Sequence, residues 1–164
     1  MQSVSQKRGF TLIELLVVIA IISLFSSIVL SSLSLAQAKA RDSRRLTDLR
    51  QIVNAIELYR SNNSSYPSTS GSWWGNCAGF GSRATSGATA YVPNVAPTYI
   101  KVLPTDPKPI APNNCYLYSS NGSDYMIMAY GTVETYSSAN NPAPRPFDTN
   151  EADFAFYTAG AAQW

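Results

Sequence analysis

A run of 24 residues without a charged side chain, from Leu15 to Ala38, constrains this chain more than any other feature. A helix needs about 20 predominantly apolar residues to cross the ~30 Å hydrocarbon core of a bilayer, so this run is long enough to span one. Lys7 and Arg8 precede the run, and basic flanking residues favour the cytoplasmic side. The sequence therefore predicts a single-pass segment with a cytoplasmic N-terminus and an exported remainder.

Two simple interpretations of this segment stay open. Ala36-Gln37-Ala38 has the small residues of a signal-peptidase site, although the apolar run exceeds the about 7–15 residues usual in a secretory signal. A plain membrane anchor would need nothing beyond hydrophobicity. Neither interpretation explains Glu14, because an ionisable side chain deep in a membrane helix costs about 2.5–3.5 kcal/mol. A carboxylate in such a segment needs a partner, which points to a function.

The order of residues ahead of the run is more specific than its composition. Lys7-Arg8-Gly9 followed by Phe10-Thr11-Leu12-Ile13-Glu14 resembles the class III signal of type IV prepilins and pseudopilins. The resemblance implies that a prepilin peptidase cuts after Gly9 and that the new amino group of Phe10 is methylated. It also implies that Glu14 pairs with the Phe10 amine of a neighbouring subunit, which would set the register between packed helices.

The second half of the predicted helix keeps a helical period, with apolar residues every three or four positions. They are Leu46, Leu49, Ile52, Val53, Ile56 and Tyr59. We therefore expect one helix from Phe10 to about Arg60, whose later half packs on the exported domain. The polar faces are expected to carry Arg44, Arg45, Asp48, Arg50 and Gln51. Arg41, Arg44 and Arg45 are interpreted as a solvated face or as contacts between subunits, in preference to a nucleic-acid site.

The weakest part of this helix is the serine-rich stretch from Ser23 to Ser34. Serine competes for backbone hydrogen bonds, so we expect this stretch to be helical in the membrane and to extend or melt locally in an assembled fibre. The expected organisation is a leader peptide at 1–9, an apolar membrane and filament-core helix at 10–35, its amphipathic continuation at 36–62, and an exported globular domain at 63–164.

The exported part is rich in turn-forming and aromatic residues, and all ten prolines and all three tryptophans follow residue 65. Strand patterns at 115–119, 124–130 and 153–158 predict an antiparallel sheet, and Asn121-Gly122 predicts a type I′ hairpin turn. The predicted fold is α+β and pilin-like, with a long N-terminal helix packed on a small antiparallel sheet. Trp73 and Trp74 are expected to cover the core rather than form an exposed adhesive surface.

The two cysteines, Cys77 and Cys115, both fall in the exported part, where an even pair indicates a disulfide rather than two free thiols. The segment Leu103-Pro104-Thr105-Asp106-Pro107 resembles the major pseudopilins of type II secretion. Some of those carry calcium near the C-terminus, where the candidate ligands here would be Asp148, Asn150, Glu151 and Asp153. Their spacing fails the EF-hand pattern, so a charged surface loop is the stronger interpretation and no metal or cofactor is expected.

The chain has no histidine, which removes histidine-based nucleophilic pairs and histidine-ligated metals, and we expect no enzyme. Residues 61–164 hold four basic and six acidic side chains, so nucleic-acid binding is not indicated. The resemblance implies a structural subunit of a type IV pilus-like surface filament, a homopolymer raised from the inner membrane by an assembly platform. The alternatives are a type II secretion pseudopilin, a minor or competence pilin, or a membrane-anchored secreted protein.

Overall fold

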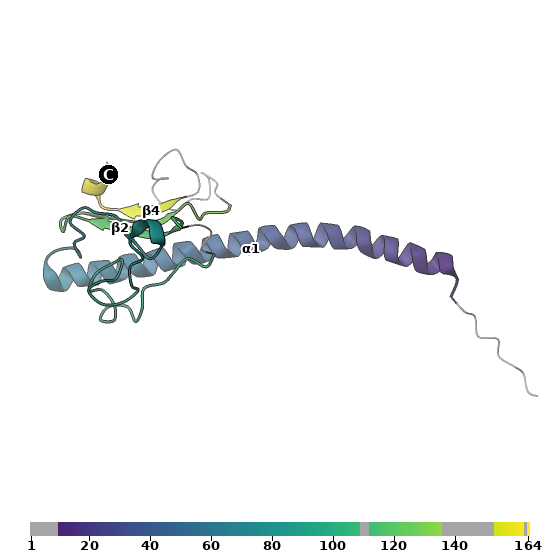
Figure 1. The fold of residues 1–164 in the computed structure, drawn as a ribbon, viewed down its shortest axis with the longest axis horizontal. Coiled ribbons are helices and arrows are strands. Elements are labelled where there is room, and N and C mark those ends of the chain that lie inside the picture. Colours follow the sequence, from purple (N-terminus) through teal and green to yellow (C-terminus); the bar gives the residue numbers. More distant parts are fainter. Residues whose placement is uncertain (1–9, 109–111, 136–152, 163) are drawn as a thin grey trace, which may run out of the picture. The chain divides into compact units, whose positions relative to one another are not determined.

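The computed structural model describes residues 10–108, 112–135, 153–162 and 164, without the side chains at 27, 28 and 31. The long helix α1 (Leu12–Asn63) comes first along the chain (Figure 1). It is followed by the strand β1 (Trp74–Gly75), the short 3-10 helix η1 (Ala78–Phe80), the strands β2 (Cys115–Ser120), β3 (Tyr125–Tyr130) and β4 (Phe154–Tyr157), and the 3-10 helix η2 (Ala159–Ala161). The structure confirms the predicted α+β, pilin-like fold.

The chain divides into two compact units, Met1–Gln37 and Ala38–Trp164. The described part of the first unit is the opening of α1, and it is helical through the serine-rich stretch. Ser23 helps there by donating its hydroxyl to the carbonyl oxygen of Ile19 at 2.8 Å, a bond that satisfies the side chain within the helix. The melting expected for this stretch concerns the assembled fibre and stays a prediction.

Across the described residues, which leave out the side chains at 27, 28 and 31, no helix is both long and apolar enough to cross a membrane. The span predicted for Leu15–Ala38 therefore stays a prediction.

The second unit places the later half of α1 against a four-stranded antiparallel sheet with the strand order β1-β2-β3-β4 (Figure 1). The register pairs Cys115 with Tyr130 at one end of the β2–β3 hairpin and Ser120 with Tyr125 at the other. Strand β1 was missed from the sequence because only two residues form it. The three strands that the sequence predicted are present within a residue or two of the expected bounds.

Each face of the sheet carries its own buried cluster, as alternation along the strands requires. Tyr116 and Tyr118 of β2 and Ile127 of β3 join the cluster that includes α1. The intervening residues, such as Leu117 and Met128, belong to the cluster on the other face. The half-buried Trp74 packs on the first cluster and Trp73 on the second, so the tryptophan pair covers the core as predicted.

The apolar stripe predicted for the later half of α1 is confirmed. Leu49, Ile52 and Ile56 are fully buried, whereas Leu46, Val53 and Tyr59 are half-buried at the edges of the same cluster. The helix ends at Asn63, after which Ser64 takes a left-handed conformation with a φ of 59° and donates its N–H to the Arg60 carbonyl. This is a common way for a helix to terminate.

The β2–β3 hairpin exists, but its predicted type I′ turn is wrong. The strands pair up to Ser120 and Tyr125, so the loop has four residues, and among them only Gly122 has a positive φ, of 94°. The side-chain Oδ1 of Asn121 accepts the backbone N–H groups of Ser123 and Asp124 at 2.9 and 2.8 Å. Asn121 thus shapes the turn through its side chain rather than through a left-handed backbone.

Candidate assembly surface and its anchoring contacts

The first candidate site is the N-terminal motif, which the structure describes from Phe10 onward; Gly9 lies outside the described residues. Phe10 is 87% exposed. The Glu14 carboxylate accepts from both the backbone N–H and the hydroxyl of Thr11 at 2.8 Å, and the Glu14 N–H donates back to that hydroxyl at 3.3 Å. These reciprocal bonds form a capping box, which satisfies free donors at the start of α1.

This local role of Glu14 was missed, although its signal is plain in the sequence. Thr11 and Glu14 stand three residues apart just before an apolar run, which is the spacing of a capping box. In a single chain, Thr11 is the partner of the Glu14 carboxylate. The predicted pairing of Glu14 with the Phe10 amine of a neighbour concerns two chains, and it stays a prediction.

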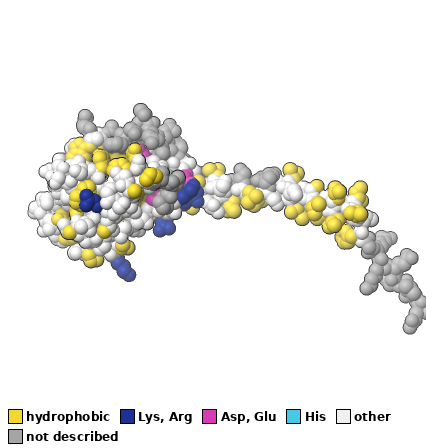
Figure 2. Space-filling model, viewed as in Figure 1, with side chains coloured by type: hydrophobic (Ala, Val, Ile, Leu, Met, Phe, Trp, Pro, Cys, Tyr) yellow, Lys and Arg dark blue, Asp and Glu magenta, His cyan; other side chains and the backbone are white. Residues whose placement is uncertain are grey.

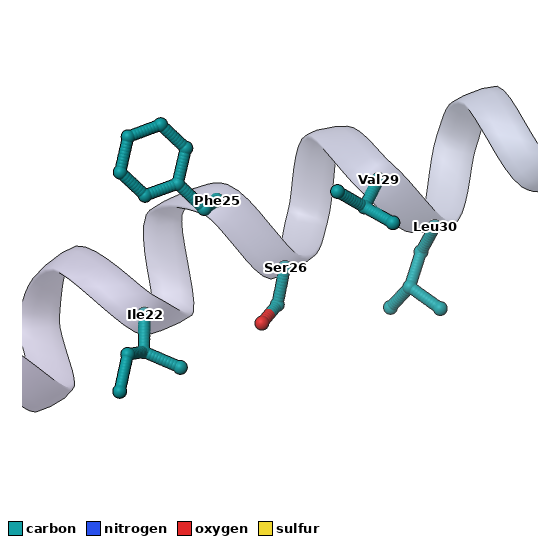
Figure 3. A pocket seen from close by; sticks show the side chains of 5 residues that line it. All are labelled: Ile22, Phe25, Ser26, Val29 and Leu30. Atoms are coloured by element: carbon teal, nitrogen blue, oxygen red, sulfur yellow. The ribbon is translucent and has the colours of Figure 1, made fainter.

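The second candidate site is the apolar surface of the first unit (Figure 2). Many of its large apolar side chains are at least half exposed, including Leu16 at 61% and Phe25 at 62%. A hollow along α1 is lined by Ile22, Phe25, Ser26, Val29 and Leu30 (Figure 3). In Figure 3, Ile22, Ser26 and Leu30 point to one side of the helix. Because large contiguous apolar patches are rare on soluble monomers, this surface is a candidate site for contact with lipid or with another protein.

The contact between α1 and the rest of the second unit includes a network of charged side chains around Arg45. The Arg45 side chain is fully buried. Its guanidinium donates two hydrogen bonds to the Asp106 carboxylate. Nε donates to Oδ2 at 2.7 Å, and one terminal nitrogen donates to Oδ1 at 3.0 Å. The remaining terminal nitrogen donates to Asp42 at 2.6 Å and to Glu134 at 3.2 Å. Arg45 therefore ties α1 to two segments that are far away in sequence.

Glu134 is the second centre of this network. Arg41 donates two hydrogen bonds to the Glu134 carboxylate, at 2.6 and 2.7 Å, and Lys108 donates a third at 2.9 Å. The hydrogen bonds from Arg41 lower the pKa of Glu134 well below its ordinary value, and Lys108 and Arg45 act in the same direction. Asp42 accepts the backbone N–H groups of Glu134 and Thr135, which fixes this segment on the helix.

These contacts correct two expectations about the polar faces of α1. Arg45 and Asp48, expected on polar faces, have exposed fractions of only 0% and 8%. The period of the helix could not show this, because the partners Asp106 and Glu134 follow Arg45 by 61 and 89 residues. A buried charge is tolerated where oppositely charged partners and hydrogen bonds surround it, and only the fold brings such partners together.

Asp48 lies on the next turn, where the Tyr116 hydroxyl donates to its Oδ2 at 3.0 Å. Burial raises the pKa of Asp48, against the effect of that hydrogen bond. Burial also raises the pKa of Tyr116, so the phenol stays protonated and remains a donor. The Tyr116 hydroxyl thus compensates part of the cost of burying the carboxylate.

The predicted disulfide is present: Cys77 and Cys115 are bonded across a sequence separation of 38 residues. It ties the loop that carries the tryptophans to the start of β2. Closing a loop of this length stabilises a fold by about 4 kcal/mol in the chain-entropy model.

The calcium candidates fall mostly outside the described residues, which exclude Asp148, Asn150 and Glu151. Asp153 is described and fully buried, and its Oδ1 accepts the backbone N–H of Gly131. Within the described part of the chain, no group of three or more His, Cys, Asp or Glu residues is arranged to hold a metal ion.

Comparisons with known proteins bear on the N-terminal motif and on the whole chain. Residues 4–30 match the family model of the prokaryotic N-terminal methylation motif. Type II secretion system core protein G of Vibrio cholerae is 30% identical over 138 residues, covering 84% of this chain and 83% of that protein. Its counterpart in Pectobacterium carotovorum is 32% identical over 141 residues, covering 83% and 78%.

A further relative is named as a pilus subunit. The type IV wide pilus major component PilA4 of Thermus thermophilus is 41% identical over 61 residues, which cover 37% of this chain and 47% of that protein. No solved structure matches the chain at a significant level. Because the core protein G relatives match along more than four fifths of the chain and the methylation motif matches at its head, the protein belongs to the type IV pilin and pseudopilin family.

Proposed function

We propose that this chain is a type II secretion pseudopilin, a structural subunit that assembles into a filament. The observation that carries the proposal is the exposed apolar surface of α1 in the first unit, which has no described element to cover it. Relatives named type II secretion system core protein G that match most of the chain support the choice of apparatus. The proposed activity is assembly, a structural rather than an enzymatic role.

In this proposal the apolar surface is covered twice, first by lipid and then by other subunits. The precursor is anchored through the uncharged run Leu15–Ala38 with its N-terminus in the cytoplasm. A prepilin peptidase cuts between Gly9 and Phe10, and the Phe10 amine is methylated. An inner-membrane assembly platform then moves the subunit into a fibre in which the apolar helices pack together. Contacts that are head-to-tail and do not close into a ring produce such a helical polymer.

Glu14 has two successive partners in this scheme. Thr11 holds its carboxylate in the capping box of the isolated subunit, and the Phe10 amine of a neighbour pairs with it in the fibre. A buried carboxylate that lost both partners would be strongly unfavourable, so the pairing would select one axial register.

A second candidate function is a subunit of a surface type IV pilus. The relative named as a pilus component favours it, although that match covers 37% of the chain. The two functions differ in where the mature fibre is found. We would shear cells, collect the released filaments, and read the N-terminus of the chain in the sheared and envelope fractions by mass spectrometry.

Methylated Phe10 confined to the envelope supports the pseudopilin, whereas methylated Phe10 in sheared filaments supports the surface pilus. An N-terminus at Lys39 would mean cleavage by a signal peptidase after Ala38, and both functions would be wrong.

The pairing role of Glu14 is tested by Glu14→Gln. Glutamine keeps an oxygen that can accept from Thr11, so α1 stays capped while the charge is lost. We expect normal membrane insertion and a large loss of fibres, measured by cross-linking and shearing. Thr11→Val is the matched control, because it removes the hydroxyl of the capping box and keeps the charge. Normal fibre yield with Glu14→Gln would contradict the pairing.

A further inference from the structure

Between residues 39 and 54, folding buries both acidic side chains of α1 and leaves three of its five basic side chains exposed. Both acidic residues of this stretch, Asp42 and Asp48, are buried, at 5% and 8% exposure. Lys39, Arg44 and Arg50 are exposed. Since Arg41 and Arg45 bond to Glu134 and Asp106, the charges left on the outer face of this stretch are three cations.

The outer face is polar as well as cationic. Helical spacing places Ser43, Thr47 and Asn54 on the same side as Lys39 and Arg50, and all five are exposed. No large apolar side chain among the described residues from 39 to 57 is exposed. We call the exposed surface of α1 between residues 39 and 54 the basic face of α1; Lys39 and Arg50 lie near one edge of it and Arg44 lies near the other, beside Asp48.

The positive charges of the basic face are hardly neutralised by acidic side chains of the same chain. Within the described residues Lys39 and Arg50 form no ion pair. Arg44 lies beside Asp48 with 3.8 Å between Nε and Oδ2, and its side chain is 65% exposed. Such a long, exposed pair contributes little.

The composition of the basic face favours a lipid surface over a protein partner. The centres of protein interfaces are rich in aromatic residues, methionine and arginine and poor in lysine, whereas the described residues from 39 to 57 expose no large apolar side chain. Ammonium, guanidinium and small hydroxyl groups are instead the donors that suit phosphate oxygens.

The position of the basic face along the chain agrees with that partner. Lys39 directly follows the uncharged run, so it stands where a spanning helix would reach the headgroups. Arg44 follows Lys39 by five residues, about 7.5 Å along a helix, which is within one Debye length of the membrane surface at physiological salt. Arg50 lies farther out and feels the same surface more weakly.

We infer that, before assembly, the basic face of α1 rests on anionic phospholipid headgroups at the outer surface of the cytoplasmic membrane. The inference rests on the proposed function, because it requires the uncharged run to sit in the bilayer. Lys39 and Arg44 provide most of the attraction, at about fivefold in affinity for each cation near an anionic surface. The contact orients the subunit on the membrane before other subunits replace the lipid.

The test compares two lysines of the full-length chain in the same sample. The chain is reconstituted into phosphatidylcholine vesicles with or without phosphatidylglycerol and treated with an uncharged amine-acetylating reagent. Mass spectrometry then follows Lys39 against the exposed Lys101, which lies outside the basic face. We expect phosphatidylglycerol to slow acetylation of Lys39 severalfold relative to Lys101, and high salt to remove the difference.

A double variant sharpens this result. Arg44→Gln with Arg50→Gln weakens the attraction without changing a buried contact of Arg45, so protection of Lys39 should fall. Equal relative rates in both kinds of vesicle would overturn the inference, even with a correctly inserted chain. Protection that is independent of phosphatidylglycerol and grows with protein concentration would assign the basic face to a neighbouring subunit and would also overturn it.

Alkaline extraction separates failure of the inference from failure of the proposed function. A chain that alkali removes from the vesicles is not anchored, and that result overturns the proposed function together with the lipid contact. A chain that resists extraction and shows no lipid-dependent protection overturns the lipid contact alone.

Discussion

The two units of this chain use the apolar side chains of the same helix in opposite ways. Ile22 in the first unit is 57% exposed, whereas Ile52 in the second is fully buried. Full burial of such a side chain stabilises a fold by about 1.5–3 kcal/mol, so Ile52 stabilises the isolated subunit and Ile22 contributes little to it. The apolar side chains of the first unit therefore contribute little to the isolated subunit and, under the proposed function, are buried only when lipid or other subunits cover them.

The polar residues differ between the units in a similar way. In the first unit Glu14 and Thr11 bond to each other at the exposed start of α1. In the second unit Arg45 bonds to side chains from distant segments and is completely buried. Substitutions in the second unit should therefore change the free energy of unfolding, and substitutions in the first should change assembly.

The largest effect is expected for Arg45→Met. The substitution leaves Asp106, Asp42 and Glu134 without the guanidinium that they share, and breaking a buried ion pair costs about 3–5 kcal/mol. The measurement is urea unfolding of the full-length chain in detergent by tryptophan fluorescence, since all three tryptophans follow residue 65. Arg50→Met is the control on the exposed side of the same helix, with an expected change within about 0.5 kcal/mol. Similar losses in both variants would contradict the special role of Arg45.

A matched pair of isoleucines tests the comparison of the units directly. Ile52→Ala should destabilise the second unit by about 2–5 kcal/mol, because it removes buried methyl groups and leaves a cavity. Ile22→Ala should leave the urea midpoint unchanged and reduce fibre yield, since this side chain is exposed in the subunit. A shift of the urea midpoint by Ile22→Ala would contradict this difference between the units.

Tyr116→Phe should have a smaller effect, of about 1–3 kcal/mol. It removes the hydroxyl that donates to Asp48 and leaves a buried carboxylate with less compensation. Adding Asp48→Asn should recover part of the loss, because burial raises the pKa of Asp48 and thus disfavours its charged form. The same urea measurement on the two single variants and the double variant gives the coupling, and strict additivity would argue against the hydrogen bond.

The smallest effect is a pH dependence that comes from Glu134. Because its pKa is lowered from 4.5, Glu134 contributes stability that is present above pH 4.5 and is lost as the pH falls toward its folded value. Urea midpoints measured between neutral pH and acid should fall for the native chain and fall less steeply for Glu134→Gln. The contribution of Asp48 to the pH dependence has the opposite sign, since protonation of a carboxylate with a raised pKa favours the folded state. An unchanged slope in Glu134→Gln would remove Glu134 as the cause.

Several elements could be predicted from the sequence because their causes are local. The spacing of Leu49, Ile52 and Ile56 predicts which side of α1 is buried, and the structure buries these residues. The apolar run and the residues around Gly9 and Phe10 indicate the family, which the methylation-motif match confirms. The β2–β3 hairpin follows from two strand patterns around Asn121-Gly122, although the turn type was wrong because the Asn121 side chain shapes the loop.

The long helix, the strands β2, β3 and β4 and the pairing of the two cysteines follow from the sequence alone, since periodicity, turn residues and a single possible pair leave few alternatives. Which charges of α1 are buried depends on the tertiary fold. Arg45 and Arg50 look alike in the sequence, but one meets Asp106 and Glu134 and the other faces outward. A charged side chain can be buried only where oppositely charged partners surround it. The partners of Arg45 are 61 and 89 residues away in the sequence, so only the folded chain brings them together.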